Sequence, residues 1–166
     1  MYAEGTGSEV VAIKKTKIRK FDHLKHSLHY SILREIGQMQ NLRGHENIIN
    51  LWDCYYKDNS VYVVMDFMPM DLHHLIWSKD VALSPTAVKN IAHQLLTAVW
   101  HLHDQGLVHW DIKPGNMLFN PEGVMKLTDF GLARWIIYED MKPLTRNVVT
   151  RFYRAPEVLY GAYHYD

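Results

Sequence analysis

The pattern of apolar residues changes near position 67, and this change limits the folds that the chain can adopt. Before it, runs of β-branched and aromatic residues predict strands at 9–14, 48–56 and 61–67. A helix is predicted at 30–42, because apolar residues recur there every three or four positions. Beyond position 67 the helical period dominates. The sequence therefore predicts an α+β fold, in which a small sheet with one helix precedes a mostly helical part.

A long helix and a second hairpin organise the later part. Ser84, followed by a proline, has the residue type of a helix N-cap, and Gly106 supplies a stop. Two short strands, 117–119 and 124–127, follow around an Asn-Pro-Glu-Gly turn, and the remainder is predicted to be a long functional loop. The apolar stripe of the helix, which we expect to face the core, comprises Val88, Ile91, Ala92, Leu95, Leu96, Val99 and Leu102.

Charge, cysteine content and hydropathy exclude several classes of partner. The 166 residues include 18 basic and 18 acidic side chains, so no net field attracts nucleic acid or a membrane surface. The longest apolar run, 61–70, is interrupted by Asp66 and is shorter than the roughly 20 residues of a membrane helix. Residues 1–10 lack the apolar core of a secretory signal, and Cys54 has no second cysteine as a partner. We therefore expect an intracellular protein, in the nucleus, the cytoplasm or both, that binds neither nucleic acid nor membrane.

Four short strings occur in a fixed order, each in the type of element that its chemistry needs. They are V-A-I-K ending at Lys14, H-W-D-I-K-P-G-N at 109–116, D-F-G at Asp129 and A-P-E ending at Glu157. A single lysine at the end of a strand is usually a solvated edge charge, and a single D-F-G is common by chance. Together the four strings carry a specific signal. Glu35 adds to it, because it lies on the inward side of the predicted helix, where a carboxylate needs a cation.

Because it contains these four motifs in order, the sequence resembles the eukaryotic protein kinases over residues 9–166. The resemblance implies a bilobal protein-kinase-like fold, with a partial N-terminal lobe at 1–67 and a partial C-terminal lobe at 68–166. The glycines before the first string lie too close to it to form the glycine-rich loop of that family. We therefore expect an incomplete fold, with the glycine-rich loop strand and the helices of the C-terminal lobe outside this chain.

The resemblance assigns roles in phosphoryl transfer from ATP to four residues. Asp111 would orient the substrate hydroxyl and accept its proton, and Lys113 would neutralise charge during transfer. Lys14, paired with Glu35, would hold the phosphates of ATP.

Further residues would bind the metal, the adenine and the interior between the lobes. Asn116 and Asp129 would hold Mg²⁺, the second cofactor that the resemblance implies. The remaining ATP-binding positions would be Ala12, Met65, Asp66, Met68, Asp71 and Leu118. Of these, Asp66 and Met68 would contribute backbone atoms to the adenine. A column of packed side chains that joins the lobes would comprise Met39, Leu51, His109 and Phe130.

The segment before A-P-E indicates the subgroup. Residues 148–157, V-V-T-R-F-Y-R-A-P-E, resemble the cyclin-dependent and MAP kinases, in which the arginine matching Arg154 favours proline after the phosphorylated residue. Thr145 matches the activating threonine, whereas Asn147 stands where MAP kinases have a tyrosine, so cyclin-dependent kinases are the closer match. The segment ending at Glu35 resembles their cyclin-binding helix. The implied partners are a cyclin and a protein substrate with Ser/Thr-Pro sites.

One motif residue departs from the family pattern. Trp110 replaces the arginine of H-R-D, which would contact the phosphate on the activating threonine. Arg34 and Arg134 resemble the two other basic residues of that phosphate site. An indole cannot make a bidentate charged contact, so we expect phosphorylation of Thr145 to matter less here.

Two interpretations of function follow from these residues. The first is a proline-directed serine/threonine kinase, similar to cyclin-dependent kinases, that transfers the γ-phosphoryl group of ATP. The second is a catalytically inactive, truncated or pseudokinase-like protein that acts as a cyclin-binding module. The complete set of catalytic residue types favours the first, and the expected missing loop and helices favour the second.

Overall fold

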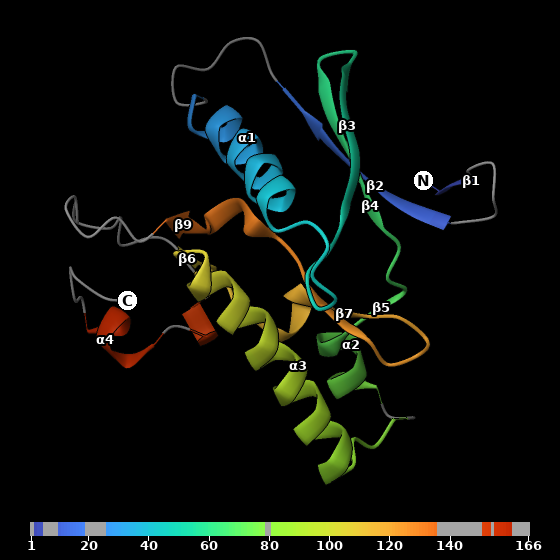
Figure 1. Ribbon diagram of the computed structural model, residues 1–166, viewed down its shortest axis with the longest axis vertical. Coiled ribbons are helices and arrows are strands. Elements are labelled where there is room, and N and C mark those ends of the chain that lie inside the picture. The colour runs from blue at the N-terminus through green and yellow to red at the C-terminus, as the bar shows by residue number, and fades with distance from the viewer. Residues whose placement is uncertain are drawn as a thin grey trace.

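A small antiparallel sheet with one helix lies above a helical part that carries a second, shorter hairpin (Figure 1). The computed structural model describes residues 2–4, 10–18, 26–78, 81–135, 151–153 and 155–160. Gly5 and Gly7, which precede the first motif, lie outside these ranges, as do Thr145 and Arg154. The upper elements are β1 (Tyr2–Glu4), β2 (Val10–Lys17), α1 (His26–Asn41), β3 (Leu51–Lys57) and β4 (Ser60–Asp66).

The lower part begins with β5 and continues through the long helix to the last described turn. Its elements are β5 (Met70–Asp71), α2 (Leu72–Trp77), α3 (Pro85–Asp104), β6 (Leu107–Val108), the 3-10 turn η1 (Pro114–Asn116), β7 (Met117–Phe119), β8 (Met125–Leu127), η2 (Phe130–Leu132), β9 (Arg134–Trp135), η3 (Arg151–Tyr153) and α4 (Pro156–Leu159). None of the helices in the described ranges is long and apolar enough to cross a membrane.

The upper sheet has the strand order β1-β2-β4-β3, and every neighbouring pair is antiparallel. The hairpin between β3 and β4 turns at Asp58 and Asn59, whose φ values of 48° and 52° are left-handed. Two consecutive left-handed residues give a turn that matches the right-handed twist of the strands, and Asp and Asn tolerate this conformation best among non-glycine residues. The polar hairpin turn predicted from the sequence is confirmed.

The strand predicted at 48–56 starts later than expected, because its first residues pair with the lower part instead. Ile48 forms a parallel bridge with Leu127 of β8, and the Ile49 N–H donates to the Leu127 carbonyl at 3.0 Å. The Leu127 N–H in turn donates to the Asn47 carbonyl at 2.9 Å. The segment between α1 and β3 therefore connects the upper sheet to the lower hairpin through backbone hydrogen bonds.

Helix α3 starts and stops as its sequence indicated. The Ser84 hydroxyl accepts from the Ala87 N–H at 3.2 Å, and Gly106 has a left-handed φ of 72°. Its packing differs from the single inward stripe that we expected. Ala98 and Leu102 are completely buried, whereas Val88 and Leu96, both expected in the core, are 51% and 66% exposed. Among the described elements, α3 packs against β6 and β8, and the outer half of the stripe is an exposed apolar flank.

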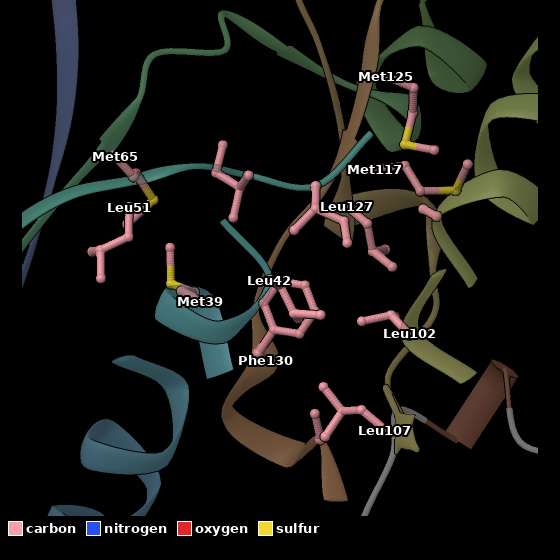
Figure 2. Close-up of a cluster of buried hydrophobic side chains, with 14 of the residues drawn as sticks. Met39, Leu42, Leu51, Met65, Leu102, Leu107, Met117, Met125, Leu127 and Phe130 are labelled. Atoms are coloured by element: carbon pink, nitrogen blue, oxygen red, sulfur yellow. The ribbon is translucent and has the colours of Figure 1, made fainter. Parts of the chain in front are cut away.

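The upper and lower parts share one hydrophobic core. Figure 2 shows Met39 of α1 and Leu51 and Met65 of the sheet converging on the same interior as Phe130 and Leu102. All five residues are at most 8% exposed. Continuous apolar packing across the junction fixes how the sheet sits above the hairpin.

Candidate active site

Lys14 and Glu35 form an ion pair between the upper sheet and α1. The Nζ atom of Lys14 lies 2.6 Å from Oε1 of Glu35. Glu35 projects from the inward face of α1 and is 7% exposed, so its charge needs this partner. Lys14 is on β2, whose alternation directs it to the same face of the sheet as Ala12. The structure thus brings together the two residues that the sequence paired.

Asp129, from the segment after β8, lies close to the Lys14–Glu35 pair. Its Oδ1 atom is 3.9 Å from Nζ of Lys14, and its side chain is 46% exposed. The residue has a left-handed backbone, with φ 68° and ψ 69°, directly before the 3-10 turn η2. Asp tolerates this region better than bulkier residues do. The turn therefore leaves the Asp129 carboxylate partly exposed to solvent and near Lys14, which is already paired with Glu35.

Asp111, Lys113 and Asn116 form a second cluster in the loop after β6. Nζ of Lys113 donates to Oδ2 of Asp111 at 2.6 Å. The amide nitrogen of Asn116 donates to the Asp111 carbonyl at 2.8 Å and to its Oδ2 at 3.1 Å. Asp111 and Asn116 are each 5% exposed. Oδ2 of this nearly buried carboxylate accepts from both an ammonium and an amide, so its orientation is fixed.

His109 holds this loop from below as a neutral ring. The Asp111 N–H donates to Nδ1 of His109 at 3.2 Å, so Nε2 carries the proton and donates to the Thr128 carbonyl at 3.0 Å. Burial lowers the pKa of His109 below its usual 6.5, which agrees with this tautomer. Its ring also meets the edge of Phe130 at a centroid distance of 5.0 Å. His109 therefore has the packing role predicted for it.

Thr128 joins the two clusters. Its N–H donates to the Asn116 carbonyl at 3.0 Å, and its carbonyl accepts from His109. Asp129 follows directly in the chain. The backbone of Thr128, directly before Asp129, is therefore held by hydrogen bonds to both Asn116 and His109.

The donor atoms of Asn116 and Asp129 suit a hard divalent cation. The amide nitrogen of Asn116 is directed to Asp111, which leaves its oxygen as the polar atom available for a ligand. Asp129 contributes a half-exposed carboxylate. Among the described residues, no group of three His, Cys, Asp or Glu side chains could hold a metal alone. This set fits Mg²⁺, which is usually bound by one or two protein oxygens together with substrate phosphates.

The residues predicted around adenine fall into two cross-strand pairs. Ala12 of β2 is opposite Met65 of β4 in the upper sheet. Asp71 of β5 is opposite Leu118 of β7 in the lower part. Met68, in the connection between these strands, is half-buried and packs against the core. Ala12 and Met65 therefore lie in the upper sheet, and Asp71 and Leu118 lie in the lower part, on the two sides of the segment that connects β4 to β5.

Asp71, predicted near the ribose, has its carboxylate engaged in capping α2. Oδ1 accepts from the His74 N–H at 2.8 Å, and Oδ2 lies 2.7 Å from Nδ1 of the same residue. Burial alone would raise the pKa of Asp71, but these hydrogen bonds from His74 lower it below its usual 3.8.

The two arginines predicted to form a phosphate site lie near each other. Nη1 of Arg134 donates to the carbonyls of Leu132 and Ala133 at 3.1 and 3.2 Å. Its pKa is lowered by burial and also by the positive charge of Arg34. Trp110, in the third position of this expected site, has a left-handed φ of 64°.

Sequence reasoning missed several residues that hold these clusters in place. Gln38 lies three residues after Glu35, on the buried side of α1, and its Nε2 donates to the Ala133 carbonyl at 3.0 Å. Gln94 of α3 accepts from the Asn47 side chain at 3.0 Å and from the Met125 N–H at 2.7 Å. The position of Gln38 on the inward face was a usable signal. No local pattern marked Gln94, because its partners lie on other elements.

Comparison with known proteins gives a consistent match. Residues 2–166 match the protein kinase domain. Over 95% of its length the chain is 43% identical to cyclin-dependent kinase 7 of Caenorhabditis elegans, of which it covers 47%. It is 41% identical over 93% of its length to the serine/threonine-protein kinase KIN28 of Saccharomyces cerevisiae, of which it covers 49%. For cyclin-dependent kinase D-1 of Arabidopsis thaliana the identity is 39%, over 95% of this chain and 38% of the relative. The chain thus spans about half, or less, of the length of these relatives.

Proposed function

Because the chain belongs to the protein kinase family, we propose that it carries the catalytic centre of a serine/threonine kinase of the cyclin-dependent type. The reaction would be transfer of the γ-phosphoryl group of ATP to a serine or threonine hydroxyl. One observation carries this proposal. The Asp111 cluster and the Lys14–Glu35–Asp129 group are complete and are linked through the hydrogen bonds of Thr128.

The loop cluster would act on the substrate hydroxyl. Its contacts with Lys113 and Asn116 fix the Asp111 carboxylate, which would orient the hydroxyl and accept its proton as the phosphorus–oxygen bond forms. The Lys113 ammonium is positioned to reduce negative charge in the transition state. The neutral His109 ring supports the Asp111 backbone and takes no part in proton transfer.

The Lys14 group would hold the phosphates. The short contact to Glu35 fixes the direction of the Lys14 ammonium, which is 43% exposed and therefore open to a ligand. Asp129 and Asn116 would bind Mg²⁺. When bound, the metal would supply positive charge between the phosphate oxygens. The protein contribution is thus positioning and electrostatic stabilisation, as phosphoryl transfer requires.

The finer features of specificity are proposed from the sequence and from the names of the relatives. Relatives named as cyclin-dependent kinases support a cyclin as the partner. On α1, Leu33 is 65% exposed beside the buried Glu35, and this apolar side chain provides a surface for a partner helix to cover. Preference for proline after the phosphorylated residue would depend on Arg154.

Transfer of radiolabel from ATP to a Ser-Pro peptide tests the proposed reaction. We expect labelling by the protein, a loss of about a hundredfold to ten-thousandfold in Asp111→Asn, and no change in Asp104→Asn, an exposed aspartate at the end of α3. A Ser-Ala peptide tests the preference for proline. Mg-ATP should raise the melting temperature of both wild type and Asp111→Asn. Equal labelling by Asp111→Asn and wild type would refute the catalytic role and favour a binding module.

A further inference from the structure

The carboxylate of Asp66 makes an ion pair that the proposed transfer reaction does not use. Asp66 is the last residue of β4, at the start of the segment that connects the upper sheet to the lower part. Its Oδ2 atom lies 2.8 Å from Nζ of Lys126, which is in the middle of β8. The two side chains are only 16% and 20% exposed. The pair therefore bridges the upper sheet and the lower hairpin in a largely shielded position.

The same carboxylate is also fixed from the side of the upper sheet. The Asn50 N–H donates to Oδ2 at 3.0 Å, and Nε1 of Trp52 donates to Oδ1 at 2.8 Å. The Asp66 N–H donates back to the Asn50 carbonyl at 3.2 Å. Three donors thus converge on one side chain, two from the start of β3 and its preceding residue and one from β8. Of these three bonds, the one from Lys126 joins Asp66 to the lower hairpin.

The ion pair lies beside the strands of the predicted adenine site. Asp66 follows Met65, which is opposite Ala12 in the upper sheet. Lys126 is opposite Leu118 in the lower hairpin. A change in the separation of these strands would therefore pull Asp66 and Lys126 apart. That movement would separate two partly buried charges, which is unfavourable. Lys126 would lose this carboxylate, whereas Asp66 would keep its bonds from Asn50 and Trp52.

We propose that the Asp66–Lys126 ion pair is a strut that sets the separation of the two halves of the predicted adenine site, and that Lys126 is a positioning residue for ATP. As far as ATP is concerned, this inference rests on the proposed function. Lys126 would act on the connecting segment through Asp66. Loss of the strut lets the upper sheet and the hairpin sample wider separations, so that fewer molecules present both halves of the adenine site together.

The test compares the bond that crosses between the two parts with one that does not. Lys126→Met removes the bond to the lower hairpin, whereas Trp52→Phe removes a bond to the same carboxylate within the upper sheet. Lys126→Arg keeps the positive charge. We expect the dissociation constant of a fluorescent ATP analogue with Mg²⁺ to rise about tenfold in Lys126→Met, equivalent to about 1.4 kcal/mol. It should change less than about twofold in the other two variants.

A second readout separates failure of the strut from failure of the proposed function. In the nucleotide-free protein, amide exchange in the connecting segment and in β8 should accelerate in Lys126→Met and remain close to wild type in Lys126→Arg. If wild type does not bind ATP, the proposed function fails, and the exchange data still decide the strut. Equal binding and equal exchange in Lys126→Met and wild type would overturn it. If Lys126→Met does not fold, Asp66→Asn, which retains one side-chain oxygen and the size of the residue, replaces it under the same criteria.

Discussion

The two clusters of the candidate site are built in opposite ways. Asp111 and Asn116 lie in one short loop and are each 5% exposed, with contacts of 2.8 and 3.1 Å between them. Lys14 and Asp129 come from distant parts of the chain, are 43% and 46% exposed, and approach only to 3.9 Å. The first cluster is compact and shielded, and the second is open to solvent.

This difference indicates which part of the geometry depends on tertiary packing. Bonds between neighbouring residues of the loop, reinforced by His109 and Thr128, fix the Asp111 cluster locally. The approach of Lys14 to Asp129 instead requires β2, α1 and the segment after β8 to keep their relative positions. We therefore expect the loop cluster to be the rigid half of the site and the Lys14 group to be the adjustable half.

Removing the side chain that supports both halves should have the largest effect on stability. Phe130 is completely buried, contacts the His109 ring and directly follows Asp129. Phe130→Ala should lower the free energy of unfolding by about 3–5 kcal/mol, because it leaves a large cavity in the shared core. Urea unfolding measures the loss. Phe152→Ala provides the matched control, since Phe152 is 93% exposed and should change stability by less than about 0.5 kcal/mol. Similar losses in both variants would contradict the shared core.

Breaking the adjustable half alone should have a smaller effect, confined to activity. Glu35→Gln retains the size of the side chain but removes the charge that fixes Lys14. Because Lys14 is 43% exposed, solvent screening limits the expected cost to about 1–2 kcal/mol, or about a fivefold to thirtyfold loss in kcat/KM. Steady-state rates with the Ser-Pro peptide measure it. Glu122→Gln, in the exposed turn of the lower hairpin, should have no effect. A loss of the same size in Glu122→Gln would contradict a specific role for Glu35.

Local features of the fold were predictable because their causes lie within a few residues. The capping serine of α3 and the Asp58-Asn59 turn each act on their own neighbours, and the structure confirms both predictions. The inward position of Glu35 on an amphipathic helix also identified its need for a cation. The motifs placed the loop cluster for the same reason, since its members are adjacent in sequence.

Contacts between distant segments could not be predicted from local patterns. Ile48 has the residue type of a strand, but it bridges to Leu127 instead of starting β3. For Asp66 only the backbone was assigned a role, whereas its carboxylate holds Lys126. Leu96 fits the apolar stripe of α3, but it is 66% exposed, whereas Ala98 and Leu102 of the same helix are buried. In each case the deciding partner lies far away in the sequence, and periodicity carries no information about it.

Acid should weaken the rigid half gradually. Burial lowers the pKa of His109 below 6.5, so the folded protein favours the neutral ring, while the unfolded chain takes up a proton near pH 6.5. Stability is therefore constant above about pH 7 and falls as the pH drops below about 6.5, until the pH reaches the folded pKa. The slope for one proton is at most about 1.4 kcal/mol per pH unit. Unfolding free energies measured between pH 7.5 and about 5 check this sign.

A second histidine provides the control for this pH dependence. The pKa of His45 is also lowered, by burial and then by His101, whose ring stacks on it at 4.5 Å. His109→Phe and His45→Gln should each reduce the slope, since each removes one titrating group. Only His109→Phe should also slow phosphoryl transfer, because only His109 supports the Asp111 backbone. An unchanged slope in both variants would show that neither ring is the source.

The smallest effect is expected from Thr145, the predicted activating threonine, and it tests how strongly the two halves are coupled. Arg134 lies just beyond Asp129 on the adjustable side, whereas Trp110 belongs to the loop. A phosphate bound by Arg134 and by an arginine at position 110 would connect the halves, but an indole makes no such contact. Thr145→Ala should therefore lower the transfer rate by less than about threefold.

The reverse substitution at the same position makes this expectation decisive. Trp110 has a φ of 64°, a conformation that is equally unfavourable for tryptophan and arginine, so Trp110→Arg changes the side chain without a new backbone cost. In that background, Thr145→Ala should cost about tenfold, because a phosphate would then hold the loop against Arg134. Transfer rates of the four proteins form a double-mutant cycle whose coupling energy should be near 1 kcal/mol. Complete loss of activity in Thr145→Ala with Trp110 present would show that the halves are joined by a route that does not pass through position 110.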